Sequence, residues 1–114
     1  MLDHVSFDVS PSKWEATVAF YTAALAPLGI TKQMEFPGPA IGFGPNPHTA
    51  KFWIVSKENA QCTNLHLAFS AQDHEQVDKF HEEAVKSGGS DNGKPGIRSY
   101  HPNYYAAFVR DPCG

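Results

Sequence analysis

The sequence predicts a single α+β domain over residues 1–114, built from two copies of a β-α-β-β-β module at 1–58 and 59–114. Three observations predict it: a histidine-containing strand motif occurs twice, an amphipathic helix pattern follows each copy, and turn-separated strand signals follow each helix. With 41% hydrophobic and 18% charged residues, a chain of 114 residues can bury one core but is too short for two. We therefore expect the modules to share one domain.

The repeated strand motif reads DHVSFDVS at 3–10 and LHLAFSAQ at 65–72, with His4 and His66 in matching positions 62 residues apart. In both copies apolar residues alternate with small or polar ones, which is typical of a strand with one buried face. The histidines fall on the face opposite the apolar residues. We expect each apolar face to pack beneath a helix, and the two histidines to converge on a metal in a cavity on the other face.

A helix is predicted after each motif. The first begins at a capping-box pattern at 12–15 and ends before Gly29. The second begins with the same cap relation at 73–76 and ends at Gly89. The two glycines lie 60 residues apart, close to the offset of the histidines, so strand and helix recur together.

Strand signals follow each helix. In the first half they lie at 30–36, 40–44 and 51–55, separated by proline-containing turns. In the second half a glycine-rich loop ending at Gly96 is followed by strand signals at 97–100 and 104–110. The second half therefore matches the first except for its last strand.

The final residues, RDPCG at 110–114, have the composition of a β-turn between two strands. No strand follows in this sequence, so the second module is predicted to be shortened by about one strand of five or six residues. An unpaired sheet edge tends to be covered by another chain, and we expect a homodimer.

Four stretches carry a resemblance to a known superfamily: LDHVSFDVS, FYTAALAPLGI, NLHLAFSA and YHPNYYAAFVRDPCG. Together with the duplicated β-α-β-β-β pattern, they make the chain similar to the glyoxalase / bleomycin resistance / extradiol dioxygenase superfamily, also called the vicinal oxygen chelate superfamily. The resemblance covers essentially the whole chain. It implies an open, cup-like β-barrel formed by two modules, commonly dimeric, with a divalent metal in the cup.

In this superfamily the metal ligands come from the first strand of each module and from the last strands, where a glutamate is usual. His4 and His66 match the first-strand positions, so the resemblance implies that they bind iron, manganese, nickel or zinc. The usual carboxylate would lie a few residues beyond the turn at 110–114, and residues 52–55 offer no substitute. Two imidazoles alone would make a weaker and more open site.

Two functions follow from the resemblance. The first is a metal-dependent lyase, isomerase or dioxygenase, in which the metal chelates two neighbouring oxygens of a small substrate. The second is a metal-free protein that sequesters a flat, polar aromatic compound, as bleomycin resistance members do. The paired histidines favour the first function, and the missing carboxylate favours the second.

Three further residues are candidates for the substrate pocket. His101 and Tyr105 are predicted at the mouth of the cup, where amphipathic rings bind flat ligands, and Arg110 is a candidate to bind a substrate carboxylate. Each also has a structural alternative, because aromatic residues beside a strand are often core and an arginine at a strand end is often solvated. Tyr104 and Tyr105 are adjacent, so only one of them can face the cup.

Charge and composition argue against several classes of partner. The formal charge is −3 and there is no run of lysine or arginine, so neither nucleic acid nor a membrane surface is expected as a partner. The sequence has no signal-peptide pattern at its start and no apolar stretch of membrane-spanning length, which predicts a cytoplasmic protein. Cys62 and Cys113 are too few for a disulfide framework, so both are expected to be free thiols.

Overall fold

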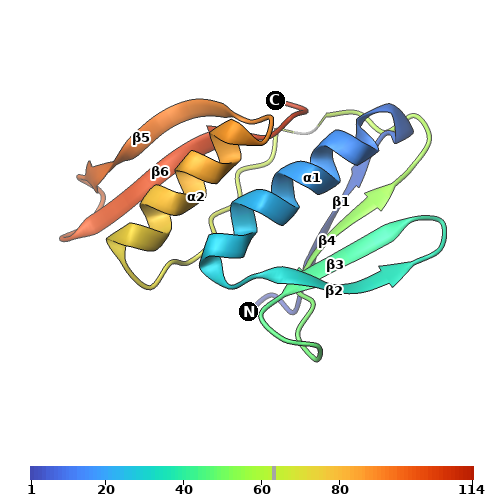
Figure 1. Ribbon diagram of the computed structural model, residues 1–114, viewed down its shortest axis with the longest axis horizontal. Coiled ribbons are helices and arrows are strands. Elements are labelled where there is room, and N and C mark those ends of the chain that lie inside the picture. The colour runs from blue at the N-terminus through green and yellow to red at the C-terminus, as the bar shows by residue number, and fades with distance from the viewer. Residues whose placement is uncertain (63) are drawn as a thin grey trace.

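A computed structural model describes residues 1–62 and 64–114 and confirms an α+β architecture with two helices and two sheets (Figure 1). The elements are β1 (Val5–Val9), α1 (Trp14–Leu25), β2 (Thr31–Phe36), β3 (Ala40–Gly44), β4 (Phe52–Ser56), α2 (His74–Lys86), β5 (Ser90–Arg98) and β6 (Tyr104–Arg110). Short 3-10 turns, η1 (Pro11–Lys13) and η2 (Ala26–Leu28), flank α1. No helix in the described part of the chain is long and apolar enough to cross a bilayer.

The first half forms a four-stranded sheet in the order β1-β4-β3-β2. Strands β1 and β4 pair in parallel, from Val5 opposite Phe52 to Val9 opposite Ser56, and the other pairs are antiparallel. The inward side chains of this sheet and Leu25 of α1 make the main core: Val9, Leu25, Ile41, Phe43, Phe52 and Ile54. The β-α-β-β-β order predicted for the first module is therefore confirmed.

The second half contains a separate two-stranded sheet, β5-β6. The strand predicted at 65–72 is wrong, because residues 64–72 belong to neither sheet. Strand β1 is held in its sheet by parallel pairing with β4, and no described strand takes the corresponding place beside this segment. The predicted alternation still holds, since Leu67 and Phe69 are half-buried while His66 is exposed. Within the described residues the two sheets do not join, and the cup-like barrel is not confirmed.

The glycine-rich loop predicted before Gly96 is in fact most of strand β5, which begins at Ser90. The ladder to β6 shifts register on both sides of Gly93. A Cβ at Gly93 would lie 3.0 Å from Cδ2 of Phe108. Glycine here marks bulges and a close approach to an aromatic ring within a strand, which composition alone does not distinguish from a loop.

The N-terminal cap predicted for the second helix is confirmed, and the one predicted for the first helix is wrong. At α2, Asp73 Oδ1 accepts the backbone N–H of Gln76 at 2.8 Å, as the sequence predicts. Gln76 Oε1 accepts the N–H of Gln72 at 2.8 Å, one residue before the N–H that a capping box uses. The capping box predicted at 12–15 is wrong, because the chain enters α1 through η1 and no side chain caps the helix. At the other end of α1, Gly29 has a φ of 75°, a left-handed conformation that glycine adopts without strain.

The two halves are joined by α1 and α2, which lie side by side (Figure 1). Phe20 and Ala24 of α1 and Ala84 of α2 are almost fully buried at this contact. A Cβ at Gly89 would overlap the ring of Phe20 and approach the carbonyl oxygen of Ala84 to 2.8 Å. The glycine that ends α2 is therefore also required by the packing of the two helices.

The expectation of free thiols is wrong, because Cys62 and Cys113 form a disulfide with their Cα atoms 5.7 Å apart. The two residues are separated by 51 positions, so their proximity is a product of the tertiary fold and leaves no local sequence pattern. The bond joins residue 62, which precedes the segment 64–72, to the turn that follows β6.

That turn is also bound to α1. The hydroxyl of Tyr21 donates to Asp111 Oδ2 at 2.7 Å, and Asp111 Oδ1 accepts the backbone N–H groups of Cys113 and Gly114 at 2.9 and 3.2 Å. Burial raises the pKa of Tyr21 far above its usual range, and the negative charge of Asp111 adds to the shift.

We predict that Tyr21→Phe lowers the free energy of unfolding by about 1–2 kcal/mol at neutral pH, because a half-buried hydrogen bond to a carboxylate is lost. A raised pKa means that the tyrosine stabilises the fold fully below its unfolded pKa of about 10 and loses this contribution as pH rises above it. Urea unfolding at neutral and alkaline pH measures both effects. The difference between wild type and variant should shrink at high pH, and Tyr104→Phe is the control. Equal stability of Tyr21→Phe and wild type at neutral pH would contradict this.

We also predict that Cys62→Ser or Cys113→Ser destabilises the fold by about 2–4 kcal/mol, because the disulfide restricts a long loop of the unfolded chain. Thiol titration of the denatured, non-reduced protein should find almost no free thiol, and two per chain after reduction. The serine variants should match the reduced wild type in urea unfolding. Two titratable thiols without reductant would disprove the bond.

Candidate functional site

A cavity of about 860 Å³ lies between the two halves of the molecule. It is lined by Phe7 of β1, by Phe20 and Tyr21 of α1, by every residue from 64 to 74, and by every residue from 104 to 111. The segment 64–72 thus runs along one side of the cavity and β6 along another. This cavity is the candidate site.

The structure brings most of the predicted site residues to this cavity. His66, His101, Tyr105 and Arg110 all line it, but His4 is not among its described lining residues. The exposed His4 lies at the entrance to β1, where its Nδ1 is 2.9 Å from Asp3 Oδ1, and this hydrogen bond lowers the pKa of Asp3. His4 and His66 share the exposed face of their segments, as predicted, but only His66 reaches the cavity.

A divalent metal was expected on His4 and His66. Within residues 1–62 and 64–114, no group of three or more histidine, cysteine, aspartate or glutamate side chains is arranged to hold a metal ion. The side chains described here therefore do not by themselves form a facial set of three ligands. Binding of iron, manganese, nickel or zinc by the two histidines stays a prediction.

The cavity also has an apolar, aromatic part of its lining, which is more buried. Phe7, Leu67, Phe69 and Phe80 are half-buried and pack against the main core. The ring of Phe69 meets that of Phe52 edge-on at 5.1 Å. A ligand entering this region would exchange water for apolar surface, which favours binding at roughly 25 cal/mol per Å².

The exposed part of the lining is polar and includes His66, His101 and Arg110, and we call it the mouth of the cavity. His66 meets the ring of Phe108 edge-on, with centroids 5.9 Å apart, and the guanidinium of Arg98 lies 5.3 Å from the same ring. Arg110 Nη2 donates to Asn92 Oδ1 at 3.3 Å. An arginine side chain can form hydrogen bonds to the anionic group of a flat ligand, and it can also stack on the face of the ligand's aromatic ring.

His101 lies beside Tyr104, with ring centroids 4.6 Å apart. Tyr105 is on the other face of β6, toward α2. Its hydroxyl donates to Asp78 Oδ1 at 2.5 Å, its ring stacks on His74 at 3.8 Å, and the hydrogen bond to Asp78 raises its pKa. Tyr105 thus lines the cavity with its hydroxyl already engaged, and Tyr104 is the tyrosine on the face shared with His101.

Sequence reasoning missed Phe108, which lines the cavity, and Arg98, whose guanidinium lies 5.3 Å from the Phe108 ring without lining the cavity itself. Phe108 is separated from Tyr104 and from Arg110 by an even number of positions in β6. Because side chains of a strand alternate between its two faces, the sequence could have placed Phe108 on the same face as these residues. Arg98 is opposite Tyr104 in the β5–β6 ladder. That pairing depends on the bulges of β5 and leaves no signal in the sequence.

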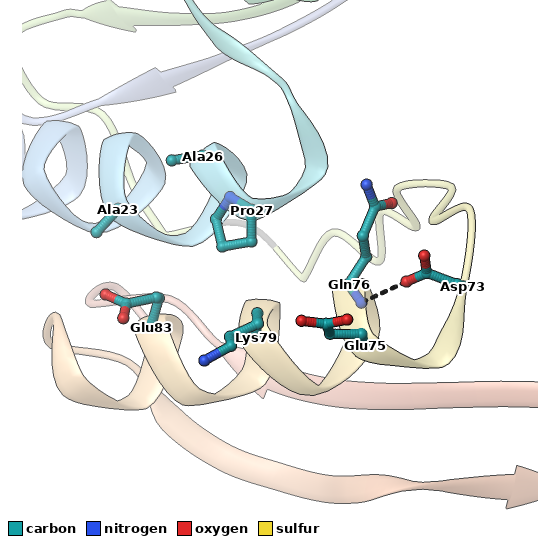
Figure 2. A pocket seen from close by; sticks show the side chains of 8 residues that line it. All are labelled: Ala23, Ala26, Pro27, Asp73, Glu75, Gln76, Lys79 and Glu83. Carbon is teal, nitrogen blue, oxygen red and sulfur yellow. Dashed lines mark hydrogen bonds between the residues drawn. The ribbon is translucent and has the colours of Figure 1, made fainter.

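A second groove, of about 500 Å³, runs between the two helices (Figure 2). Ala23, Ala26 and Pro27 form one wall, and the other is the polar side of α2 with Glu75, Lys79 and Glu83 (Figure 2). None of the predicted site residues lies here. The charged side chains of its wall are those expected on the solvated face of a helix.

Comparison with solved structures supports the resemblance seen in the sequence. A crystal structure of a glyoxalase/bleomycin resistance protein from Albidiferax ferrireducens T118 has 30% sequence identity and a TM-score of 0.76, covering 96% of this chain and 89% of that one. This chain belongs to the glyoxalase/bleomycin resistance protein family. The structure of the hypothetical protein SA1046 from S. aureus has a TM-score of 0.63 at 16% identity, covering 97% and 87% of the two chains, and shows that this glyoxalase-family fold is shared more widely. No family model and no curated protein matches the sequence.

Proposed function

We propose that this glyoxalase/bleomycin resistance family member binds a flat, anionic aromatic molecule at the mouth of the large cavity. The observation that carries the proposal is that His66, His101 and Arg110 line one cavity although they lie on three different parts of the chain. A concave site with an apolar interior and a few polar groups at its mouth is the usual form of a small-molecule site.

Charge at the mouth supports an anion over a neutral ligand. Arg110 lines the cavity, and the guanidinium of Arg98 lies 5.3 Å from the ring of the lining residue Phe108. Neither arginine forms an ion pair among the described residues. Arginine pairs with a carboxylate through two parallel hydrogen bonds. The ring of Phe108 supplies the surface against which a planar ligand would stack.

We predict that Arg110→Ala weakens the binding of 3,4-dihydroxybenzoate about tenfold or more, because a charge-assisted hydrogen bond at the mouth is lost. Isothermal titration calorimetry measures the affinity, and His66→Ala should have a smaller effect in the same direction. Lys32→Ala removes a positive charge from the exposed strand β2, away from the cavity, and should leave binding unchanged. Equal losses in the Lys32 and Arg110 variants would refute a site at the mouth.

The second candidate is a metal-dependent enzyme of the lyase, isomerase or dioxygenase type. One observation favours it: His4 and His66 are exposed at equivalent places in the two repeats, and in the residues that follow each histidine the apolar side chains are more buried than their neighbours. When bound, a divalent metal would supply Lewis-acid stabilisation of oxygen anions. The homodimer also stays a prediction, supported by the fact that β6 pairs with β5 alone among the described strands.

Elemental analysis tests this second candidate. If the histidines bind a metal, protein incubated with iron, manganese, nickel or zinc and then desalted should keep about one ion per chain, and the His4→Ala/His66→Ala double variant should keep none. His48→Ala/His81→Ala removes two histidines that do not line the cavity and controls for nonspecific binding to imidazole. Retention that is equal in both double variants, or absent in wild type, would count against a metal-dependent enzyme.

A further inference from the structure

Arg98, the last residue of β5, lies back along its own strand. Its Nη2 donates to the carbonyl oxygen of Lys94, four residues earlier, at 2.7 Å, and its guanidinium carbon is 5.3 Å from the centroid of the Phe108 ring. The side chain is half-buried. The guanidinium is therefore held against the sheet before any ligand binds, and the hydrogen bond to Lys94 uses only one of its five N–H groups.

Two glycines of β5 leave the space that this guanidinium occupies. A Cβ at Gly96 would lie 3.1 Å from Arg98 Nη1, and a Cβ at Gly93 would lie 3.2 Å from Arg98 Nη2. Nonbonded heavy atoms attract best at roughly 3.5–4.0 Å, so a side chain at either position would push the guanidinium away. Glycine within a strand often marks such a close approach. Gly93 and Gly96 are therefore positioning residues for Arg98.

Arg110 lies on the same face of the second sheet. Val109 packs against the buried cluster between the helices, so Phe108 and Arg110, on either side of it, point to the opposite face. Arg98 is paired with Tyr104, which is an even number of positions from Phe108, and so shares that face. Residues two positions apart on a strand are about 7 Å apart. We call this surface, which carries Arg98, Phe108 and Arg110, the Phe108 face.

The two arginines have no carboxylate partner among the described residues. The acidic residues next to them in the second half are bound elsewhere. Asp91 Oδ1 is 2.8 Å from His81 Nε2 of α2, and Asp111 Oδ2 accepts from the hydroxyl of Tyr21 at 2.7 Å. Like charges repel, and an anion that binds between two arginines relieves this repulsion. The Phe108 face therefore favours a ligand with more than one negative charge.

We propose that the Phe108 face binds a planar ligand with two carboxylate groups, one on Arg98 and one on Arg110, with the ring of the ligand against Phe108. The guanidinium fork of arginine matches a carboxylate through two parallel hydrogen bonds. Because Arg98 is already oriented, it loses little freedom when the ligand binds. This inference rests on the proposed function and deepens it, since it names a dicarboxylate as the class of ligand and Arg98 as its second anchor.

The experiment compares benzoate, which has one carboxylate, with isophthalate and terephthalate, which have two, by isothermal titration calorimetry on the full chain. Wild type should bind at least one dicarboxylate about tenfold more tightly than benzoate, because a second charge-assisted contact is added. Arg98→Ala should abolish this preference. Lys94→Ala is the matched control, because it removes a positive charge from the same strand and leaves the backbone oxygen that accepts from Arg98.

Gly96→Ala tests the positioning of Arg98. Gly96 does not have a positive φ, and among the described residues the added methyl would meet only Arg98 and, at 4.0 Å, the carbonyl oxygen of Lys94. The variant should weaken dicarboxylate binding about threefold in wild type and leave it unchanged in Arg98→Ala, as a double-mutant cycle for two coupled residues. Circular dichroism and the thermal midpoint establish that the variants remain folded.

Equal affinity of wild type for benzoate and for both dicarboxylates overturns this proposal, and the proposed function is then decided separately by Arg110→Ala and 3,4-dihydroxybenzoate. The proposal is also overturned if Arg98→Ala and Lys94→Ala reduce the preference equally. A Gly96→Ala effect of the same size with and without Arg98 contradicts the role of the glycine in positioning. Binding of none of these ligands would contradict this proposal and the proposed function together.

Discussion

Parallel pairing between β1 and β4 is the constraint on which the first half of the molecule depends. The chain leaves β1, crosses through α1 and two antiparallel strands, and returns as β4 beside its starting point. This return pairs the inner edge of β1 and brings Phe52 and Ile54 under α1, where they are almost fully buried. Strand β4 therefore both pairs the backbone hydrogen-bonding groups of β1 and supplies side chains to the core.

In the second half, no strand among the described residues makes the corresponding return. Residues 65–71 keep the alternation of a strand, with Leu67 and Phe69 inward, but form no ladder among the described residues. The disulfide and the Tyr21–Asp111 hydrogen bond hold the neighbouring turn in place. Between this segment and β6 lies the large cavity, which His66, His101 and Arg110 line.

Much of this fold could be predicted because its signals are local. Alternation placed Val5, Phe7 and Val9 inward, and the cap at Asp73 started α2 where expected. The errors concern non-local partners: a strand at 65–72 requires a pairing strand, and the disulfide joins residues 51 positions apart. The candidate site divided in the same way. The alternation of apolar and polar residues correctly predicted that His4 and His66 are exposed. It could not predict whether the two histidines face each other, because that depends on how the two halves of the molecule are placed.

The cross-link between Cys62 and Cys113 also determines how the molecule would respond to mechanical load. The two cysteines lie at either end of a segment that contains α2, β5 and β6. If the chain were pulled from its two termini, tension would pass from residue 62 directly to residue 113 through the covalent bond. The first sheet would extend under the force, whereas the second half would be shielded from it as long as the sulfur atoms stayed joined.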